Sequence, residues 1–406
     1  MKKRILALFL AIVLMVSLSA CATGGDDDGI VLTMGSWRSD DVDQMNALLA
    51  EYKKIAPDVT INFEPTLPHD YNAWLRMNLE AGTGPDLMYA RSFATGRELF
   101  EDGYFADCSD IPGLMDNFTD ANLAPWMSDG KMFAVPFAAV SHAVYFNKDI
   151  FAENGLSIPN TWDEFIAVCK ALDAAGITPL ANGVADEWDI LECMFLAMLP
   201  NYVGVGDQRV LYESGQKKLN DEAFVNAYSD LAMLAPFLPS GFEAVTYDDS
   251  QVLFATQEAA MFVDGSWTME VYRDVDFNWS VFAIPARNAG DTAITFHPDM
   301  AITMNAATEH PEEARAFLAW LCTQEGATTA SQALPLGFFP MINFPIALDD
   351  PRANDFLALN NGKETDARFI WPEYMDLYAP MNAAVIDVLK GNSTPQEAAD
   401  SIAAIA

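Results

Sequence analysis

Aromatic and charged side chains stand together at the ends of two predicted strands. Trp37, Arg38 and Asp41 follow one apolar run, and Tyr89 and Arg91 close another. Flat aromatic rings can cover the apolar C–H faces of a sugar, while carboxylates and guanidinium groups bind its hydroxyls through charge-assisted hydrogen bonds. These residue types are therefore suited to binding a carbohydrate. The alternative is a half-buried packing tryptophan beside a helix N-terminus, where acidic side chains are favoured.

The spacings of the common catalytic motifs are absent from the sequence. It contains no His-Glu-x-x-His, no Gly-x-Ser-x-Gly, no P-loop and no dinucleotide-binding glycine pattern. Adjacent acids such as Asp248 and Asp249 could supply the two carboxylates of a glycosidase. With 58 acidic residues in the chain, however, such pairs are expected on the solvated surface. We therefore expect no enzyme, no cofactor and no metal site, and keep an exported glycoside hydrolase as the alternative.

The charge balance narrows the choice of partners. The 406 residues include 58 acidic and 22 basic ones, which gives a net charge of −36 at pH 7. Such a chain repels the phosphates of nucleic acids and does not dock on anionic lipid through a basic patch. No nucleic-acid partner is expected. A cationic solute such as a polyamine would suit this charge and remains a second alternative.

The N-terminus reads as a lipoprotein signal. Basic residues at 2–4 precede an apolar run at 5–16 that is too short for a comfortable membrane-spanning helix. Leu18-Ser19-Ala20-Cys21 resembles a bacterial lipobox, in which the cysteine thiol receives a diacylglycerol. We expect a signal peptide at 1–20, and lipidated Cys21 with a flexible tether at 21–29. The alternative is an uncleaved anchor. The folded body would lie on the outer face of the cytoplasmic membrane, extracellular or periplasmic, and touch the membrane through the lipid only.

The elements that must position the aromatic and charged residues alternate along the chain. Patterns at 30–36, 59–63 and 87–89 predict strands, and those at 40–55 and 71–81 predict helices. Strand–helix alternation argues for a parallel sheet in an α/β domain.

The rest of the body continues in the same way, without a repeat or a Pro- or Ser-rich linker. Further strands are expected at 132–135, 143–146, 259–263, 281–285 and 300–304. Capping boxes open helices at Thr161 and at Thr394, and Thr308 is expected to cap another. If there are two domains, the chain therefore passes between them through ordered strands.

Four cysteines remain in the body: Cys108, Cys169, Cys193 and Cys322. They allow three pairings, and no Cys-x-x-Cys is present. We interpret them as small buried apolar side chains, while the exported location keeps one disulfide possible.

Several short motifs occur in a recognisable order behind the lipobox. They are Gly82-Thr83-Gly84-Pro85-Asp86, Gly103-Tyr104-Phe105-Ala106-Asp107, Val135-Pro136 with Val144 to Asp149, Pro159 to Glu164, Ala260 to Trp267, and His310 to Ala314. With these motifs the chain, from about residue 30 to its end, resembles the family 1 extracellular solute-binding proteins of ABC importers.

The resemblance implies a type II, periplasmic-binding-protein-like fold with two α/β lobes, each a mixed sheet flanked by helices, joined by a hinge of several segments. Lobe 1 would comprise 30–139 and 286–336, and lobe 2 would comprise 140–285 and 337–406. Ligand would bind in the cleft between the lobes, and hinge closure would trap it from both sides.

The resemblance also implies site residues. Trp267 occupies a family position that stacks on sugar. His142, Trp188, His297 and Asp299 are expected beside it, together with Trp37, Arg38, Asp41, Tyr89 and Arg91. Phe338, Phe339, Trp371 and Tyr378 are candidates for the far wall. The function implied is capture of a carbohydrate, an oligosaccharide in particular, by a monomer that delivers it to an ABC permease. The sugar, its length and its linkage are left open.

Overall fold

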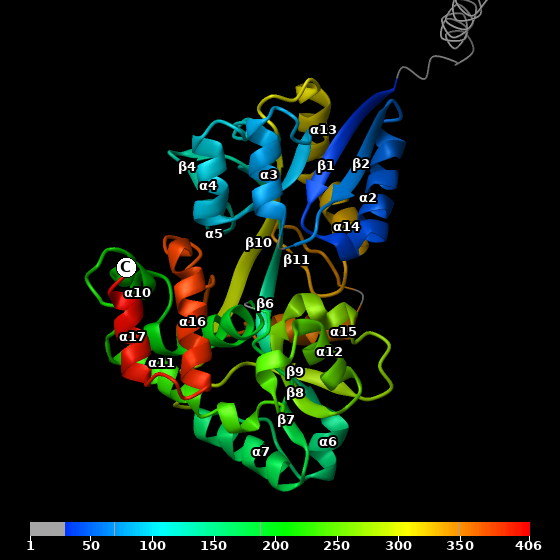
Figure 1. The fold of residues 1–406 in the computed structure, drawn as a ribbon. Helices are drawn as coiled ribbons and strands as arrows, with labels where there is room; N and C mark the ends of the chain where they lie inside the picture. The colour runs from blue at the N-terminus through cyan, green and yellow to red at the C-terminus, as the bar shows by residue number, and fades with distance from the viewer. Residues whose placement is uncertain (1–28, 69, 187, 349) are drawn as a thin grey trace, which may run out of the picture.

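The computed structural model describes residues 29–68, 70–186, 188–348 and 350–406. The predicted signal peptide, Cys21 and the tether up to Asp28 lie outside the described residues. Figure 1 shows two lobes, one above the other, with long strands running between them.

A parallel sheet opens the first lobe. Strand β1 (Ile30–Ser36) pairs in parallel with β2 (Val59–Pro65) and with β3 (Leu87–Arg91). A short 3-10 turn (Ser39–Asp41) and α2 (Val42–Ile55) link the first two strands, and α3 (Tyr71–Glu80) leads to the third. The predicted alternation of strands and helices is confirmed here.

Two long antiparallel strands connect the lobes. β6 (Val135–Asn147) and β10 (Ile294–Met304) pair with each other. In the first lobe β10 also pairs with β3, and in the second lobe β6 pairs with β8 (Ala259–Gly265) and β9 (Trp279–Phe282). The sequence suggested separate strands at 132–135 and 143–146. This was wrong, because one buried strand, β6, runs from 135 to 147. The stretch just before it forms only the two-residue strand β5 (Lys131–Met132).

Mixed pairing continues into the second lobe, where β7 (Thr178–Leu180) runs parallel to β8. The other short strands are β4 (Met127–Ser128), β5 (Lys131–Met132), β11 (Phe339–Pro340) and β12 (Thr365–Asp366). The first lobe also carries α4 (Phe93–Glu101), α5 (Asp120–Leu123), α13 (Pro311–Leu321) and α14 (Gln324–Ala333).

Helices of the second lobe surround its sheet (Figure 1). They are α6 (Lys148–Glu153), α7 (Trp162–Ala174), α8 (Leu196–Met198), α9 (Pro200–Val203), α10 (Asp207–Glu213), α11 (Glu222–Ala232), α12 (Tyr247–Ala255), α15 (Pro351–Ala358), α16 (Tyr378–Leu389) and α17 (Pro395–Ala403). A π-helical turn (Asp189–Phe195) precedes α8.

Helix caps follow the sequence in two of three cases. The Thr161 hydroxyl accepts from the Glu164 N–H, and Thr394 forms a full capping box with Glu397. The expected cap at Thr308 is wrong. Helix α13 begins at Pro311, and the Thr308 hydroxyl instead donates to the carboxylate of Asp86 at 2.6 Å.

Apolar side chains gather in separate cores. The first is built from residues of β1 to β3, α2, α13 and the upper part of β6 and β10, and the second from α7, α11, α16 and their neighbours. A smaller cluster packs around Tyr145 and Phe254 in the second lobe. Phe338, Met341 and Ile342 join the first core. The residues at which the chain passes from lobe to lobe stay a prediction.

The four described cysteines are buried and form no disulfide, which confirms their interpretation as buried side chains. Across the described ranges, no helix combines the length and the apolarity needed to span a membrane.

Candidate binding cleft

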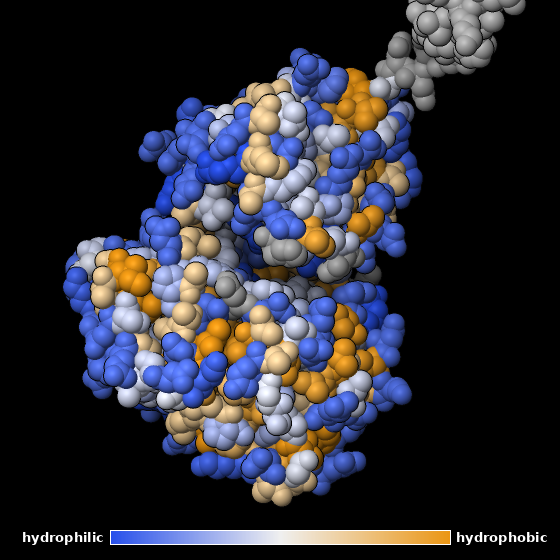
Figure 2. All heavy atoms as spheres, viewed as in Figure 1, coloured by the Kyte–Doolittle hydropathy of each residue, from blue (hydrophilic) through white to orange (hydrophobic). Residues whose placement is uncertain are grey.

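Four of the predicted residues lie on the strands that join the lobes or just after β8. His142 lies on β6 and His297 and Asp299 lie on β10, while Trp267 follows the end of β8. The His142 and Trp267 rings meet edge to face, with centroids 5.3 Å apart. Figure 2 shows a recess between the two lobes on the face drawn there.

The centre of this cluster is Arg368, which the sequence did not single out. Its side chain is 3% exposed. The guanidinium donates to a Glu192 carboxylate oxygen at 2.8 Å and to His142 Nε2 at 3.3 Å. It also lies 5.2 Å from the ring centre of Trp267 and 5.0 Å from that of Trp371. A fixed cation is therefore held between two indoles.

Glu192 is the second residue that sequence reasoning missed. It lies in the π-helical turn, and its other carboxylate oxygen accepts from the Tyr378 hydroxyl at 2.5 Å. Asp299 lies 3.9 Å from the Arg368 guanidinium. Neither Arg368 nor Glu192 belongs to a motif, and only their meeting in space reveals them.

The indole of Trp267 is held in place from two sides. It folds back over Gly265, so that a Cβ on Gly265 would come within 2.0 Å of the ring. Its Nε1 donates to the Tyr247 hydroxyl at 2.8 Å, and that hydroxyl donates to Asp264 at 2.7 Å. The centroid of the Trp188 ring lies 3.8 Å from that of Tyr247 and 6.3 Å from that of Trp267. These contacts give the predicted stacking residue one orientation.

Two buried carboxyls support this side of the cleft. Burial raises the pKa of Asp264 to about 8 and that of Asp189 to about 7. Asp189 accepts hydrogen bonds from Asn182, the Gly183 N–H and Ser250. Hydrogen bonds of this kind satisfy polar groups that would otherwise be costly to bury.

In the first lobe, two of the expected residues pack rather than project. Trp37 is 4% exposed and meets Tyr71 and Tyr89 edge to face. Tyr89 is wholly buried, and its hydroxyl donates to the Met45 sulfur at 3.1 Å. This placement favours a packing role for Tyr89.

Arg38 and Asp41 form a bidentate pair. Both hydrogen bonds are 2.6 Å long, and the Asp41 carboxylate is almost fully buried. The Arg38 guanidinium also lies 4.9 Å from the Phe338 ring. Asp41 therefore has its charge compensated within the first lobe.

Arg91 differs from the other two arginines. Its guanidinium stacks 3.7 Å from the ring centre of Trp37, and across the described ranges it makes no hydrogen bond or ion pair. Burial lowers its pKa, and so does the charge of Arg368, whereas Asp299 and Glu192 raise it.

The two histidines are buried and neutral. Burial first, and the charge of Arg368 second, hold the pKa of both His142 and His297 well below the ordinary value. Because His142 Nε2 accepts from Arg368, the neutral ring carries its proton on Nδ1. His297 is 1% exposed and lies beside Phe93 and Trp371, and neither of its ring nitrogens has a hydrogen-bond partner.

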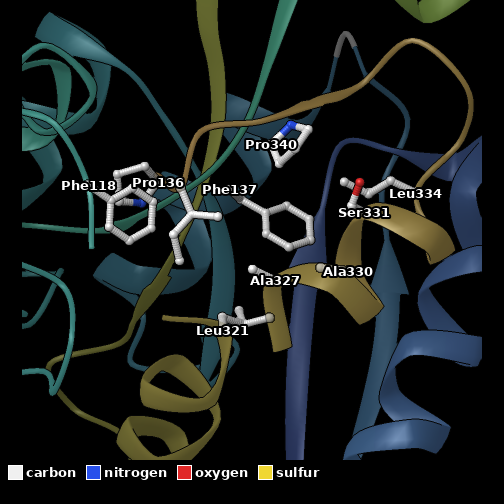
Figure 3. Close-up of a pocket in the computed structure, with 10 residues that line it drawn as sticks. Phe118, Pro136, Phe137, Leu321, Ala327, Ala330, Ser331, Leu334 and Pro340 are labelled. Carbon is white, nitrogen blue, oxygen red and sulfur yellow. The ribbon is translucent and has the colours of Figure 1, made fainter. Parts of the chain in front are cut away.

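A separate pocket in the first lobe has different chemistry. Figure 3 shows Phe137 of β6 beside Ala327 and Ala330 of α14, with Pro340 of β11 on the other side. Ser331 supplies one hydroxyl, and no charged side chain lines this pocket. It lacks the polar groups that bind a sugar. A second pocket, between α3 and α4, is lined by Tyr71, Arg76, Tyr89, Arg91 and Thr95, among others.

Comparison of the sequence with known proteins finds a matching family and several relatives. The model of the bacterial extracellular solute-binding protein family matches residues 38–328. The chain is 23% identical over 322 residues to the multiple sugar-binding protein of Streptococcus mutans, which covers 76% of each protein. It is 22% identical over 339 residues to the galactooligosaccharide-binding protein of Bacillus subtilis, covering 81% of this chain and 78% of that protein.

Solved structures share the architecture. A chitin oligosaccharide binding protein aligns with a TM-score of 0.80 at 21% identity, over 93% of this chain and 98% of that one. A structure from a study of xylan utilization by Caldanaerobius polysaccharolyticus aligns with a TM-score of 0.83 at 18% identity, over 93% and 100% of the two chains. At such identities the likeness shows a common two-lobed fold.

Proposed function

The chain belongs to the family of bacterial extracellular solute-binding proteins, and from this membership we propose that it captures a carbohydrate for an ABC importer. The ligand, an oligosaccharide in particular, binds in the cleft between the lobes and is handed to the permease. The relatives named for multiple sugars and for galactooligosaccharides support this ligand class.

The observation that carries the proposal is the oriented indole of Trp267. It stands beside the Trp188 ring and against a guanidinium that is anchored to Glu192. Flat rings next to fixed donors and acceptors are what a sugar needs, because its faces are apolar and its rim is polar. The binding energy comes from contacts completed on closure, less the costs of desolvation and lost freedom.

A cationic solute fits this cleft less well. Beyond the effect of burial, the positive charges of Arg91 and Arg368 lower the pKa of His297, and the same charges would repel a polyamine. The net charge of −36 made that ligand attractive, but the charge nearest the indoles is positive.

We also propose how the protein is placed in the cell and how it moves. Cys21 carries a lipid that holds the body at the outer face of the cytoplasmic membrane, and the protein acts as a monomer. The lobes, 30–139 with 286–336 and 140–285 with 337–406, close about the strands that join them. The permease is its partner.

The test is a thermal-shift screen of residues 22–406 against mono- and oligosaccharides and polyamines. A ligand that binds only the folded state stabilises it by about 2.7 kcal/mol at one hundred times its dissociation constant. A shift with one sugar class supports the proposal. A shift with a polyamine alone, or release of reducing ends from a polysaccharide, would overturn it.

Trp267→Ala then tests the site. Binding of the identified sugar should weaken more than tenfold while the protein stays folded, because the stacking face is lost. Trp267→Phe keeps an aromatic face and should recover part of the affinity. Unchanged affinity in folded Trp267→Ala would remove Trp267 from the site. Isothermal titration calorimetry measures all three proteins.

A further inference from the structure

Arg91, the last residue of β3, is a cation with no anion in contact with it among the described residues. The other two arginines of this region each bind a carboxylate, Arg38 with Asp41 at 2.6 Å and Arg368 with Glu192 at 2.8 Å. Within the described ranges, Arg91 has Trp37 against one face of its guanidinium and no carboxylate within ion-pair distance. We infer that the sugar captured here carries a carboxylate, as a uronic acid residue does, and that this group binds Arg91.

The inference rests on the proposed function, since it assumes that a sugar enters the cleft. The inference adds that one sugar residue of the ligand is acidic. When a guanidinium stacks face-on against an indole, its N–H groups still point outward within the guanidinium plane. A carboxylate at that edge can accept two parallel hydrogen bonds. Such charge-assisted bonds are roughly twice as strong as bonds to a neutral hydroxyl.

An unpartnered imidazole lies on β10, the strand that pairs with β3. His297 is almost fully buried, neither of its ring nitrogens has a partner, and Arg91 and Arg368 are among the charges that lower its pKa. Buried polar atoms are nearly always hydrogen-bonded, so each exception needs an explanation. A ligand carboxylate has about four acceptor positions, enough to take bonds from both Arg91 and the N–H of His297.

The carboxylates already present do not saturate the cations. Glu192 is bound by Arg368 and Tyr378, while Asp299 lies 3.9 Å from Arg368 and acts on Arg91 only through space. The charge of Arg368 also lowers the pKa of Arg91, because like charges repel. An anion at Arg91 would relieve that repulsion.

The test compares two ligands that differ only in charge. One is a short uronic acid oligomer of the class found in the screen, and the other is the same oligomer with its carboxylates converted to methyl esters. Titration calorimetry should find the acid bound at least tenfold more tightly by the wild-type protein. Ester binding as tight as, or tighter than, acid binding would overturn the inference, and would leave the proposed sugar function standing. Failure to bind either oligomer while neutral sugars bind would overturn it as well.

Variants then assign the effect to Arg91. Arg91→Gln should remove the preference for the acid and change ester affinity by less than threefold, which also shows that the variant is folded. Arg91→Lys keeps the charge and should retain part of the preference. Lys54→Gln, on the exposed side of α2, removes a charge from the same lobe and is the matched control. An equal loss for acid and ester in Arg91→Gln would contradict the assignment. If no sugar of any kind binds, it is the proposed function that fails, and the inference fails with it.

Discussion

At the scale of single residues, the orientation of the Trp267 indole depends on Asp264, whose side chain is fully buried. Asp264 accepts from Tyr247, and Tyr247 accepts from Trp267. With burial raising its pKa to about 8, the Asp264 carboxyl holds a proton in the folded protein at neutral pH. In the unfolded chain an aspartic acid loses its proton near pH 4.

This difference predicts how stability depends on pH. Between pH 7 and 8 the folded protein holds a proton on Asp264 that the unfolded chain has lost, so raising the pH lowers stability, by about 1 kcal/mol over this interval. Asp189, whose pKa burial raises to about 7, adds a smaller fall over the same interval. The buried histidines contribute little here, since the unfolded chain protonates them mainly below pH 6.5. Asp264→Asn should reduce the fall between pH 7 and 8 to the part that Asp189 contributes.

Chemical denaturation at pH 7.0, 7.5 and 8.0 measures this directly. Asp248→Asn, on the exposed side of α12, is the control and should keep the wild-type slope. An equally steep fall in Asp264→Asn would show that another group releases the proton.

Residue by residue, the sequence singled out aromatic residues of the candidate cleft but not the charged pair at its centre. Trp267 is found from a short motif at the end of a strand. Arg368 and Glu192 lie 176 positions apart in a chain with no local pattern around either, so only the folded protein brings them to 2.8 Å. For Tyr89 the pattern allows two interpretations, because a tyrosine at the end of a predicted strand can equally turn inward, as its hydroxyl does toward Met45.

At the scale of elements, the turn after β8 is the critical piece. Gly265, the last residue of β8, is followed by a 3-10 turn (Ser266–Glu270), and the indole of Trp267 lies back over Gly265. The Gly265 carbonyl also accepts from the Tyr145 hydroxyl at 2.8 Å. The strand end is thereby fixed to the sheet, and the absence of a side chain on Gly265 makes room for the indole.

Gly265→Ala should therefore displace Trp267 although residue 265 touches no ligand. The added Cβ would lie 2.0 Å from the ring, far inside contact distance, so the indole must move. Sugar affinity should fall about tenfold, in the direction of Trp267→Ala, and tryptophan emission should shift as the ring leaves its setting.

Gly84→Ala serves as the matched control. Its Cβ would meet the flexible end of the Leu79 side chain in the first lobe, so affinity should stay near that of the wild type. Wild-type affinity in Gly265→Ala would mean that the indole can settle elsewhere without loss.

Strand boundaries were harder to predict than strands. The runs at 132–135 and 143–146 predicted two separate strands, yet β6 is buried along all 13 residues. The register of β10 shifts between Pro298 and Ala301, opposite Pro136, where a residue without an N–H is tolerated. Thr308 was misread for a related reason: its hydroxyl had a better partner in Asp86, distant in sequence.

At the scale of the whole molecule, the lobes also touch at the rim of the cleft. Arg97 of α4 forms hydrogen bonds of 3.1 and 3.2 Å with Glu373, which precedes α16 in the second lobe. Both side chains are partly exposed. In the proposed closing motion, this ion pair favours the closed arrangement over an open one.

Breaking the Arg97–Glu373 pair should favour opening and weaken ligand binding modestly. Exposed ion pairs contribute about 0.2–1 kcal/mol, so Arg97→Gln or Glu373→Gln should raise the dissociation constant by no more than about fivefold, chiefly through faster release. Stopped-flow measurement of ligand release checks the rate.

The charge-reversed double variant, Arg97→Glu with Glu373→Arg, is the control and should release ligand more slowly than either reversed single variant. If the single neutralising variants bind and release like the wild type, the pair makes no contribution to closure.

The overall architecture was predictable because it depends on repeated patterns. Strand–helix alternation and a set of short motifs in order were enough for the two-lobed α/β fold, which the structural neighbours share. The domain limits are harder, since Phe338, Met341 and Ile342 pack into the first core beyond Leu336. Where the chain passes between lobes through ordered strands, the sequence shows no change of composition that would mark the boundary.

The strands that join the lobes also carry part of the candidate site, His142 on β6 and His297 with Asp299 on β10. If the lobes close as proposed, the work of bending these strands is included in the affinity for every ligand. Replacing the surface loops with those of a relative would not be enough to transfer that relative's specificity, because site residues on the joining strands would stay unchanged. For the same reason, an optical biosensor built on this scaffold should carry its dyes on the rims of the lobes, where they report bending without altering it.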